Sequence, residues 1–269
     1  MMSEYDLPLV AASFLVAVLA AYAALFFGAR LTNAKDGERR KWLAAGAVLM
    51  GTGVWTMHFV GMRAMPMDVA MTFDVLMTAV SWLAAVVASG IALHIIGRER
   101  LGAPLFAGAT LFMAGGIVVM HYLGMYAMRM SAPPTFNIGF LAVSIVIAVV
   151  ASGVALALCR KLQGMDGAGS LAIQFVAALV MAAAICGMHY TGMMAMIFPE
   201  GAVPAADNGL RGDWMGIPLA LFCAALLGVA LVVTVLDVKH QRDAAVRKAE
   251  EDQRVAELAF VDTVTGLPN

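Results

Sequence analysis

Seven stretches of this chain are each long enough to cross a lipid bilayer and contain no Asp, Glu, Lys or Arg. A membrane-spanning helix needs roughly 20 apolar residues. Only 13% of the chain is charged and its formal net charge is −1, which argues against a soluble domain or a nucleic-acid-binding module. We therefore expect an all-α integral membrane protein with seven transmembrane helices. The predicted spans are residues 7–29, 42–62, 75–97, 101–128, 138–159, 169–199 and 214–236.

The basic residues predict how these spans are oriented. Of the 17 Lys and Arg, 14 follow the first, third, fifth and seventh spans, and Arg63, Arg129 and Arg211 lie on the opposite side. Loops rich in Lys and Arg stay in the cytoplasm. We expect a multi-pass protein of the bacterial inner membrane, with its N-terminus outside and its C-terminus in the cytoplasm.

A nine-residue motif occurs three times, with the pattern Met-His-aromatic-x-Gly-Met-x-Ala-Met. Its copies begin at Met57, Met120 and Met188, and the three His are 63 and 68 residues apart. A further Met stands eight residues before each His, at Met50, Met113 and Met181. Such internal repetition indicates a repeated structural unit.

The repetition continues into the helix that follows the motif. Residues 86–93 recur 63 positions later as residues 149–156, and residues 228–231 are a weaker third copy. The predicted unit is a helical hairpin formed by spans two and three, four and five, and six and seven. The fold class is thus three parallel hairpins with pseudo-threefold symmetry plus one extra N-terminal helix.

The motifs predict a metal site near the outer face of the membrane. Positions i, i+4 and i+7 of a helix share one face, so each His shares a stripe with Met residues. Imidazole and thioether ligands suit copper, above all Cu(I). The candidate ligands are His58, His121, His189, Met62, Met125 and Met193, followed by Met57, Met120 and Met188; Met65, Met128 and Met196 end the stripes.

Other interpretations of these residues stay open. Met can fill gaps and His can hydrogen-bond inside a bundle without any metal. Three His would also suit an intramembrane zinc hydrolase, although no acid recurs with them. A copper transport or storage protein and a haem site with His and Met ligands are further alternatives. Three further residues are weaker candidates for the site: Cys186, His94 and His240.

The three motifs resemble the MHYT domain, a bacterial membrane sensory module named for the sequence that stands here at residues 188–191. The resemblance covers residues 7–237. It implies seven spans, copper bound through Met and His, and the sensing of a diatomic gas such as O2, CO or NO, or of copper itself. The first two motifs read Met-His-Phe-Val and Met-His-Tyr-Leu, so the motif Thr occurs only in the third copy.

The C-terminal residues predict a signalling output. Residues 238–261 are charged and rich in Ala, which favours a helix that continues the seventh span and pairs in a homodimer. Residues 262–269 resemble the opening of a GGDEF diguanylate cyclase domain. We expect a sensor domain over 1–237, a signalling helix over 238–261 and the beginning of a GGDEF domain over 262–269. This chain itself is expected to have no enzyme activity, and an EAL phosphodiesterase domain in the full-length protein is left open.

Overall fold

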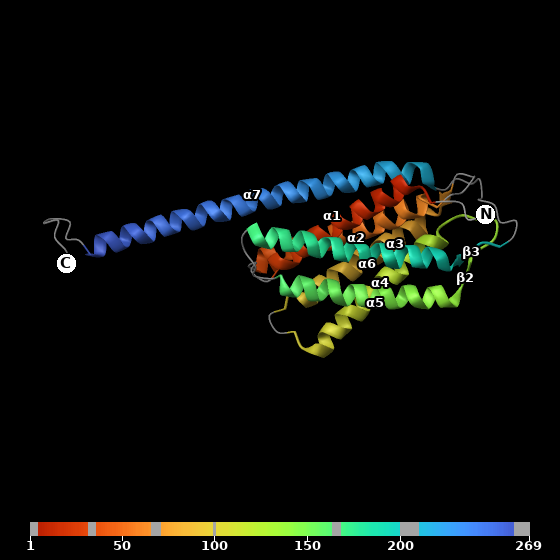
Figure 1. Cartoon of the computed structure of the whole chain (residues 1–269), viewed down its shortest axis with the longest axis horizontal. Coiled ribbons are helices and arrows are strands. Elements are labelled where there is room, and N and C mark those ends of the chain that lie inside the picture. Colours follow the sequence, from red (N-terminus) through yellow and green to blue (C-terminus); the bar gives the residue numbers. More distant parts are fainter. Residues whose placement is uncertain are drawn as a thin grey trace. The chain divides into compact units, whose positions relative to one another are not determined.

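The computed structural model describes residues 5–31, 36–65, 71–98, 101–162, 168–199 and 210–260, and it is almost entirely helical. It divides into two units, Met1–Leu227 and Gly228–Asn269. The helices are α1 (Leu7–Leu31), α2 (Asp36–Arg63), α3 (Val75–Ile96), α4 (Ala103–Tyr126), α5 (Ile138–Lys161), α6 (Ala168–Ala195) and α7 (Gly212–Phe260). Figure 1 shows α1 to α6 lying alongside one another in the first unit.

Six helices in the described part of the chain, α1 to α6, are long and apolar enough to cross a membrane. Their side chains have an arrangement suited to lipid, because large apolar residues such as Leu83, Val146 and Val176 are exposed while the motif His are buried. The seventh predicted span, 214–236, lies in α7, and many of its side chains are outside the described residues. The crossing of the membrane by α7 stays a prediction.

Polar caps begin three of these helices and join each one to the end of a motif helix. Asp6, Asp74 and Asn137 accept hydrogen bonds from the first backbone N–H groups of α1, α3 and α5. A cap of this kind satisfies donors that the first turn of a helix leaves free. The backbone N–H groups of the same three residues donate to carbonyls at or just beyond the ends of the three motif helices, those of Ala64, Ala127 and Ala195.

These contacts correct the predicted role of the first span. We expected α1 to be an extra helix and the seventh span to complete the third hairpin. In the structure α1 is equivalent to α3 and α5 in its cap, and it packs between α2 and α6. The sequence left this pairing ambiguous because motif helices alternate with other helices, so each motif helix can be grouped with the helix before it or after it.

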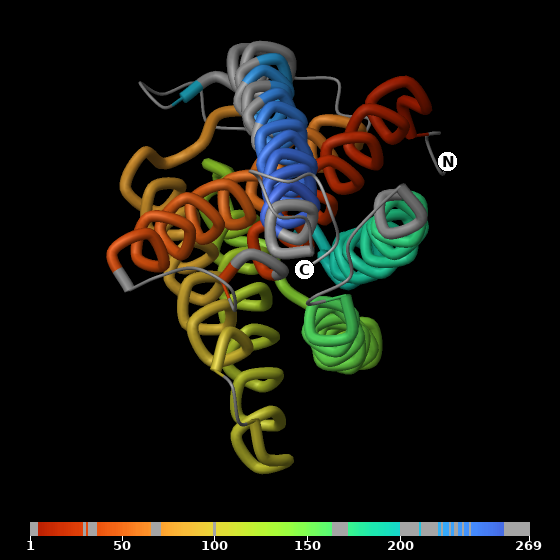
Figure 2. Tube along the Cα trace, turned by 90° about the vertical axis from the view of Figure 1, so that its left-hand side faces the viewer, coloured from red at the N-terminus to blue at the C-terminus, as the bar shows by residue number. Residues whose placement is uncertain are grey.

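The six helices form a closed series in which each packs against the next and α6 returns to α1. An end view shows α5 and α6 side by side, in green and teal (Figure 2). Close packing is possible because small residues lie at the contacts. A Cβ on Gly51 would lie 2.9 Å from the carbonyl carbon of Ala85 in α3, so α2 and α3 approach closely at this glycine.

Two short strand pairs, which the sequence analysis did not predict, lie beyond the ends of the helices. β1 (Thr72–Phe73) pairs antiparallel with β4 (Leu210–Arg211), and β2 (Thr135–Phe136) pairs antiparallel with β3 (Met196–Ile197). We expected residues 196–199 to continue the sixth helix. Because Met196 joins β3 instead, α6 ends at Ala195.

The Gly228–Asn269 unit contains the C-terminal part of α7, which remains helical to Phe260. This confirms a helix over the predicted signalling segment as far as the structure describes it. Its side chains are exposed at Arg242, Val246 and Glu250. The residues that resemble the start of a GGDEF domain, 262–269, lie outside the described residues.

Candidate metal centre

The three motif His meet at one point inside the bundle. The Nδ1 atom of His58 lies 3.0 Å from that of His121 and 3.1 Å from that of His189, and the third side of the triangle is 3.3 Å. All three side chains are buried, with exposed fractions of 0–1%. Three ring nitrogens thus converge from α2, α4 and α6, as the motif spacing predicted. We call these residues the His triad.

Hydrogen bonds within the His triad do not satisfy all three nitrogens. A neutral imidazole Nδ1 carries either a hydrogen or a lone pair, never both. At least two of the three Nδ1 atoms therefore present the same group to each other, which is unfavourable in a buried site. A bound cation would accept a lone pair from all three.

The size of the His triad suits a small cation. The centre of a triangle with these sides lies about 1.8 Å from each Nδ1, while a metal–imidazole bond is about 2.0 Å long. These three nitrogens would therefore all be within bonding reach of a small cation held between them. Among the His, Cys, Asp and Glu side chains of the described residues, these three His form the group whose ligand atoms lie close enough together to hold one metal ion, within 4.8 Å of one another.

The motif glycines make room for the His triad. A Cβ on Gly61 would lie 2.8 Å from Cδ2 of His189 and closer still to its Nε2. Gly124 stands in the same relation to His58, and Gly192 to His121, with Cδ2 at 2.9 Å in both cases. Each His therefore occupies the space above the glycine of another motif. We expected this glycine to leave room for a ligand or a neighbouring helix, and it accommodates a neighbouring imidazole.

The remaining ring nitrogens are buried as well. The Nε2 atoms of the three His have no hydrogen-bond partner among the residues that the structure describes. If Nδ1 supplies its lone pair to a cation, the neutral ring carries its hydrogen on Nε2. In this ring orientation the nitrogens that could hold a metal ion are the three Nδ1 atoms, a distinction between the two nitrogens that the sequence did not make.

Aromatic residues hold the rings of the His triad in place. Phe59, Tyr122 and Tyr190 each follow a motif His and contact its ring edge to face, with centroids 4.8–4.9 Å apart. The hydroxyl of Tyr122 is hydrogen-bonded to Ser144 at 2.6 Å, and that of Tyr190 to Ser13 at 2.8 Å.

The first motif has Phe at this position and uses another aromatic donor. The indole of Trp55 donates to Ser81 at 2.9 Å. Ser13, Ser81 and Ser144 occupy the same place in α1, α3 and α5, seven residues after their caps. The sequence analysis missed these serines; the spacing from Asp6, Asp74 and Asn137 is the signal that could have found them.

The predicted ligands Met62, Met125 and Met193 share one buried cluster, with exposed fractions of at most 3%. Met71, Met128 and Met196 join them, and Met65 packs against the group. The predicted helical stripe extends only to i+4, because α2, α4 and α6 end before Met65, Met128 and Met196. The C-terminal ends of the three motif helices, which the sequence predicts to face outward, therefore carry a methionine-rich layer, which we call the outer Met cluster.

The other predicted ligands, Met57, Met120 and Met188, are not brought together. They are buried in three separate clusters, each facing a different part of the bundle. Cys186 packs in the cluster of Met57 and does not join the His triad. His94 is exposed on α3 and His240 on α7. The structure thus places these residues away from the converging nitrogens.

Comparison with known proteins identifies related sequences over the whole chain. A family model described as "Bacterial signalling protein N terminal repeat" (MHYT) matches residues 1–45, 51–109 and 115–172. The first match includes α1, in agreement with its equivalence to α3 and α5. No solved structure matches the chain.

Three curated relatives are signalling proteins. The bifunctional diguanylate cyclase/cyclic di-GMP phosphodiesterase MucR of Pseudomonas aeruginosa is 40% identical over 100% of this chain, which spans 40% of that protein. The cyclic di-GMP phosphodiesterase NbdA of the same species is 37% identical over 98% of this chain and 35% of its own length. The signaling protein YkoW of Bacillus subtilis is 32% identical over 76% of this chain and 26% of its own length. The chain therefore spans well under half of these relatives.

Proposed function

The chain belongs to the MHYT family of bacterial signalling repeats, and on this basis we propose that its His triad is the metal-dependent sensory site of a membrane receptor. The observation that carries the proposal is the convergence of three buried Nδ1 atoms within 3.3 Å of one another. Uncompensated polar groups are costly inside a membrane protein and are commonly functional. The chain is a sensor region, with no catalytic domain evident in its described residues.

Copper is the metal that the surroundings of the site favour. The ligands are imidazoles beside a layer of thioethers, a soft environment that suits Cu(I). When bound, copper would supply a coordination position for a small ligand such as O2, CO or NO. The His triad would hold the ion, and the outer Met cluster with the adjoining aromatic rings would exclude water from it.

The competing sites have less support. A zinc hydrolase needs an open position and usually an acid or base, and no carboxylate joins the His triad among the described residues. The two axial ligands of a haem lie on opposite faces of a wide macrocycle. The three Nδ1 atoms lie within 3.3 Å of one another, which leaves no room for a macrocycle between them. A copper transport or storage protein could use the same site and would differ from a sensor only in its output. A signalling assay distinguishes these functions.

We further propose that α1 to α6 form three repeats related by a pseudo-threefold axis through the His triad. The reciprocal contacts of each His with the glycine of another motif support this arrangement. The three equivalent caps at Asp6, Asp74 and Asn137 support it as well. An ion on such an axis would pull equally on three motif helices, so that its binding would tighten all of them.

The signal would be transmitted from the His triad through α7. Thr56, two residues before His58, is hydrogen-bonded through its hydroxyl to the Sγ atom of Cys223 in α7 at 2.8 Å. Met57 packs in the same cluster against which Ala220 of α7 lies. The corresponding positions in the other motif helices are Val119 and Gly187, so this polar contact is specific to the first repeat. Ligand binding at His58 would thereby act directly on α7.

The output that we propose is control of cyclic-di-GMP turnover. Both relatives from P. aeruginosa are named for that chemistry. In the full-length protein, α7 would cross the inner membrane outward to inward and continue as a signalling helix into a GGDEF domain. Pairing of two such helices in a homodimer would bring two cyclase domains together.

The test of the sensory site is the metal content of the purified chain. The variants His58→Ala, His121→Ala and His189→Ala should each lose most of the bound copper, measured by elemental analysis. His94→Ala is the matched control, because His94 is an exposed imidazole on α3. Full copper content in all three variants, or a wild-type protein that never holds copper after reconstitution with Cu(I), would contradict the proposal.

A further inference from the structure

Three methionines that the proposed sensory site does not use lie in the other half of the bundle. Met50, Met113 and Met181 each stand eight residues before a motif His, which is roughly 12 Å along a helix. Their exposed fractions are 5%, 3% and 3%. One comes from each of the motif helices α2, α4 and α6.

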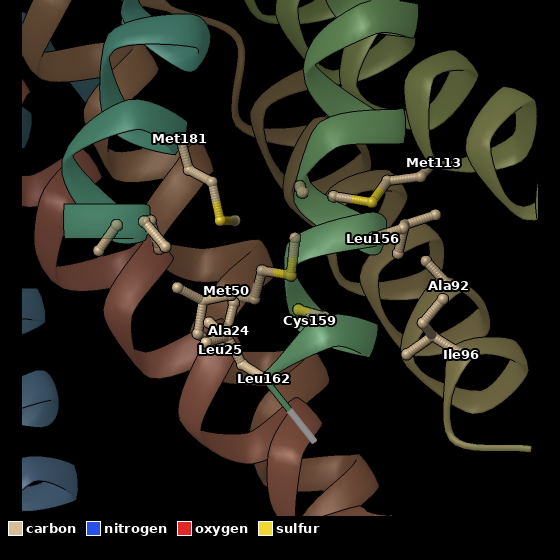
Figure 3. Close-up of a cluster of buried hydrophobic side chains, with 14 of the residues drawn as sticks. Ala24, Leu25, Met50, Ala92, Ile96, Met113, Leu156, Cys159, Leu162 and Met181 are labelled. Carbon is tan, nitrogen blue, oxygen red and sulfur yellow. The ribbon is translucent and has the colours of Figure 1, made fainter. Parts of the chain in front are cut away.

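Like the motif His, these residues come from three helices and lie in one region between them. All three belong to one buried cluster between the helices. Figure 3 shows their side chains directed toward one another from three different helices. We call them the inner Met triad. Met57, Met120 and Met188 are equally buried and also occur once per motif, yet they lie in three separate clusters.

The inner Met triad is distinct from the His triad. Between the two layers, four residues before each His, the motif helices carry Val54, Ile117 and Ile185. Val54 is buried and packs in a cluster that Ile185 also contacts. Aliphatic side chains bind no metal, so they separate the two layers.

The chemistry of the inner Met triad suits one class of ligand. Thioether sulfur selects soft ions, and Cu(I) in particular. The rest of the buried cluster is formed by Ala, Leu and Ile side chains and the free thiol of Cys159, and Tyr22 is among the partly buried residues that pack against it. A soft monovalent ion is therefore what this layer would accept, and the thiol of Cys159 would lose its proton if it coordinated such an ion.

We propose that Met50, Met113 and Met181 form a second metal site, which binds a soft monovalent cation independently of the His triad. The site consists of thioethers, whereas the first consists of imidazoles. The bundle would then hold two cations at different depths, with the aliphatic layer between them. The proposal stands apart from the sensory function, since it needs neither a gas ligand nor a signalling output.

The test uses silver(I), a redox-stable probe for soft-ion sites, titrated into the whole chain in detergent. The variant with Met50, Met113 and Met181 all changed to Leu should bind one silver(I) fewer than the wild type. Exchange of Met for Leu nearly conserves volume and usually costs less than about 1.5 kcal/mol per site, so the fold should persist. The matched control changes Met57, Met120 and Met188 to Leu and should bind as much silver(I) as the wild type.

The outcomes separate the two sites. A protein without the His triad, made by changing all three His to Ala, should still lose one silver(I) when the inner Met triad is removed. Equal silver(I) binding by the two triple-Leu variants would overturn the proposal and leave the His site untouched. If the triple variant does not fold, Met113→Leu alone should weaken binding of one silver(I) at least tenfold, and unchanged binding would be equally decisive.

Discussion

The replacement of Gly124 by Ala tests whether the geometry of the His triad governs metal binding. A Cβ at this position would lie 2.9 Å from Cδ2 of His58 and nearer still to Nε2. An unstrained carbon contact is about 3.5 Å or more, so the ring of His58 must move by roughly 0.5–1 Å. It cannot move inward, because its Nδ1 already lies 3.0 Å from that of His121 and 3.1 Å from that of His189. The ring must therefore swing away from the centre of the triad.

Such a movement exceeds what a metal site tolerates. Ligand distances in a metal site hold to about 0.2 Å. Loss of one ligand's orientation typically lowers metal affinity by about 10–100-fold, and we expect a decrease of that size in Gly124→Ala. The stability of the apo-protein should fall by about 1–3 kcal/mol from overpacking, against a gain of up to about 1 kcal/mol in helix propensity.

The assay is a competition titration of Cu(I) with a chelator of known affinity, combined with unfolding of the apo-protein. Gly115→Ala is the matched control, since Gly115 lies on the same helix and a Cβ there would meet nothing within 4 Å. The double variant His58→Ala/Gly124→Ala should be no less stable than His58→Ala, because the clashing ring is gone. Wild-type copper affinity in Gly124→Ala would refute the reasoning, and with it the assignment of the His triad as the metal site.

Three further predictions follow from the helices. The side chain of Asn137 accepts hydrogen bonds from the backbone N–H groups of Gly139 and Phe140 at 2.9 and 3.2 Å. Asn137→Ala should therefore lower the free energy of unfolding by about 1 kcal/mol. An unchanged free energy of unfolding would show that the cap is dispensable. A reporter fused after residue 237 should be cytoplasmic and one inserted within residues 200–209 should be outside; both on one side would contradict the seventh span. In the full-length protein, one residue inserted at Ala249 rotates the following helix by about 100°, and it should abolish the ligand response of cyclic-di-GMP production. An insertion of seven residues should largely preserve it, and an equal response in both would make this helix a passive tether.

The identity of the His triad was predictable from the sequence. Three copies of one motif at spacings of 63 and 68 residues place His58, His121 and His189 at similar depth, and the apolar spans require helices there. Met62, Met125 and Met193 were likewise expected near them, and they share one cluster at the helix ends. These expectations needed only the rise of a helix and the length of a span.

Other features of the site could not be predicted from the sequence, because they depend on contacts between helices. Periodicity gives the rotation of a residue about its own helix, but a contact depends also on how that helix is turned toward its neighbours. The Met directly before each motif His was therefore kept as a candidate ligand, ranked after the Met four residues beyond the His, yet Met57, Met120 and Met188 lie in three separate clusters. The same limit hid the role of Gly61, Gly124 and Gly192, whose space is filled by the imidazole of another motif.

The sequence by itself determined the membrane class of the chain, its repeated motif and the three His at one level, because hydropathy and spacing act along a single helix. Only the tertiary structure decided that Nδ1 is the converging nitrogen and that α1 is equivalent to α3 and α5. Both depend on the closing of six helices into one series, in which α6 returns to pack against α1. That closure joins residues 177 positions apart, such as Ser13 and Tyr190, and it arises from the packing of all six helices together.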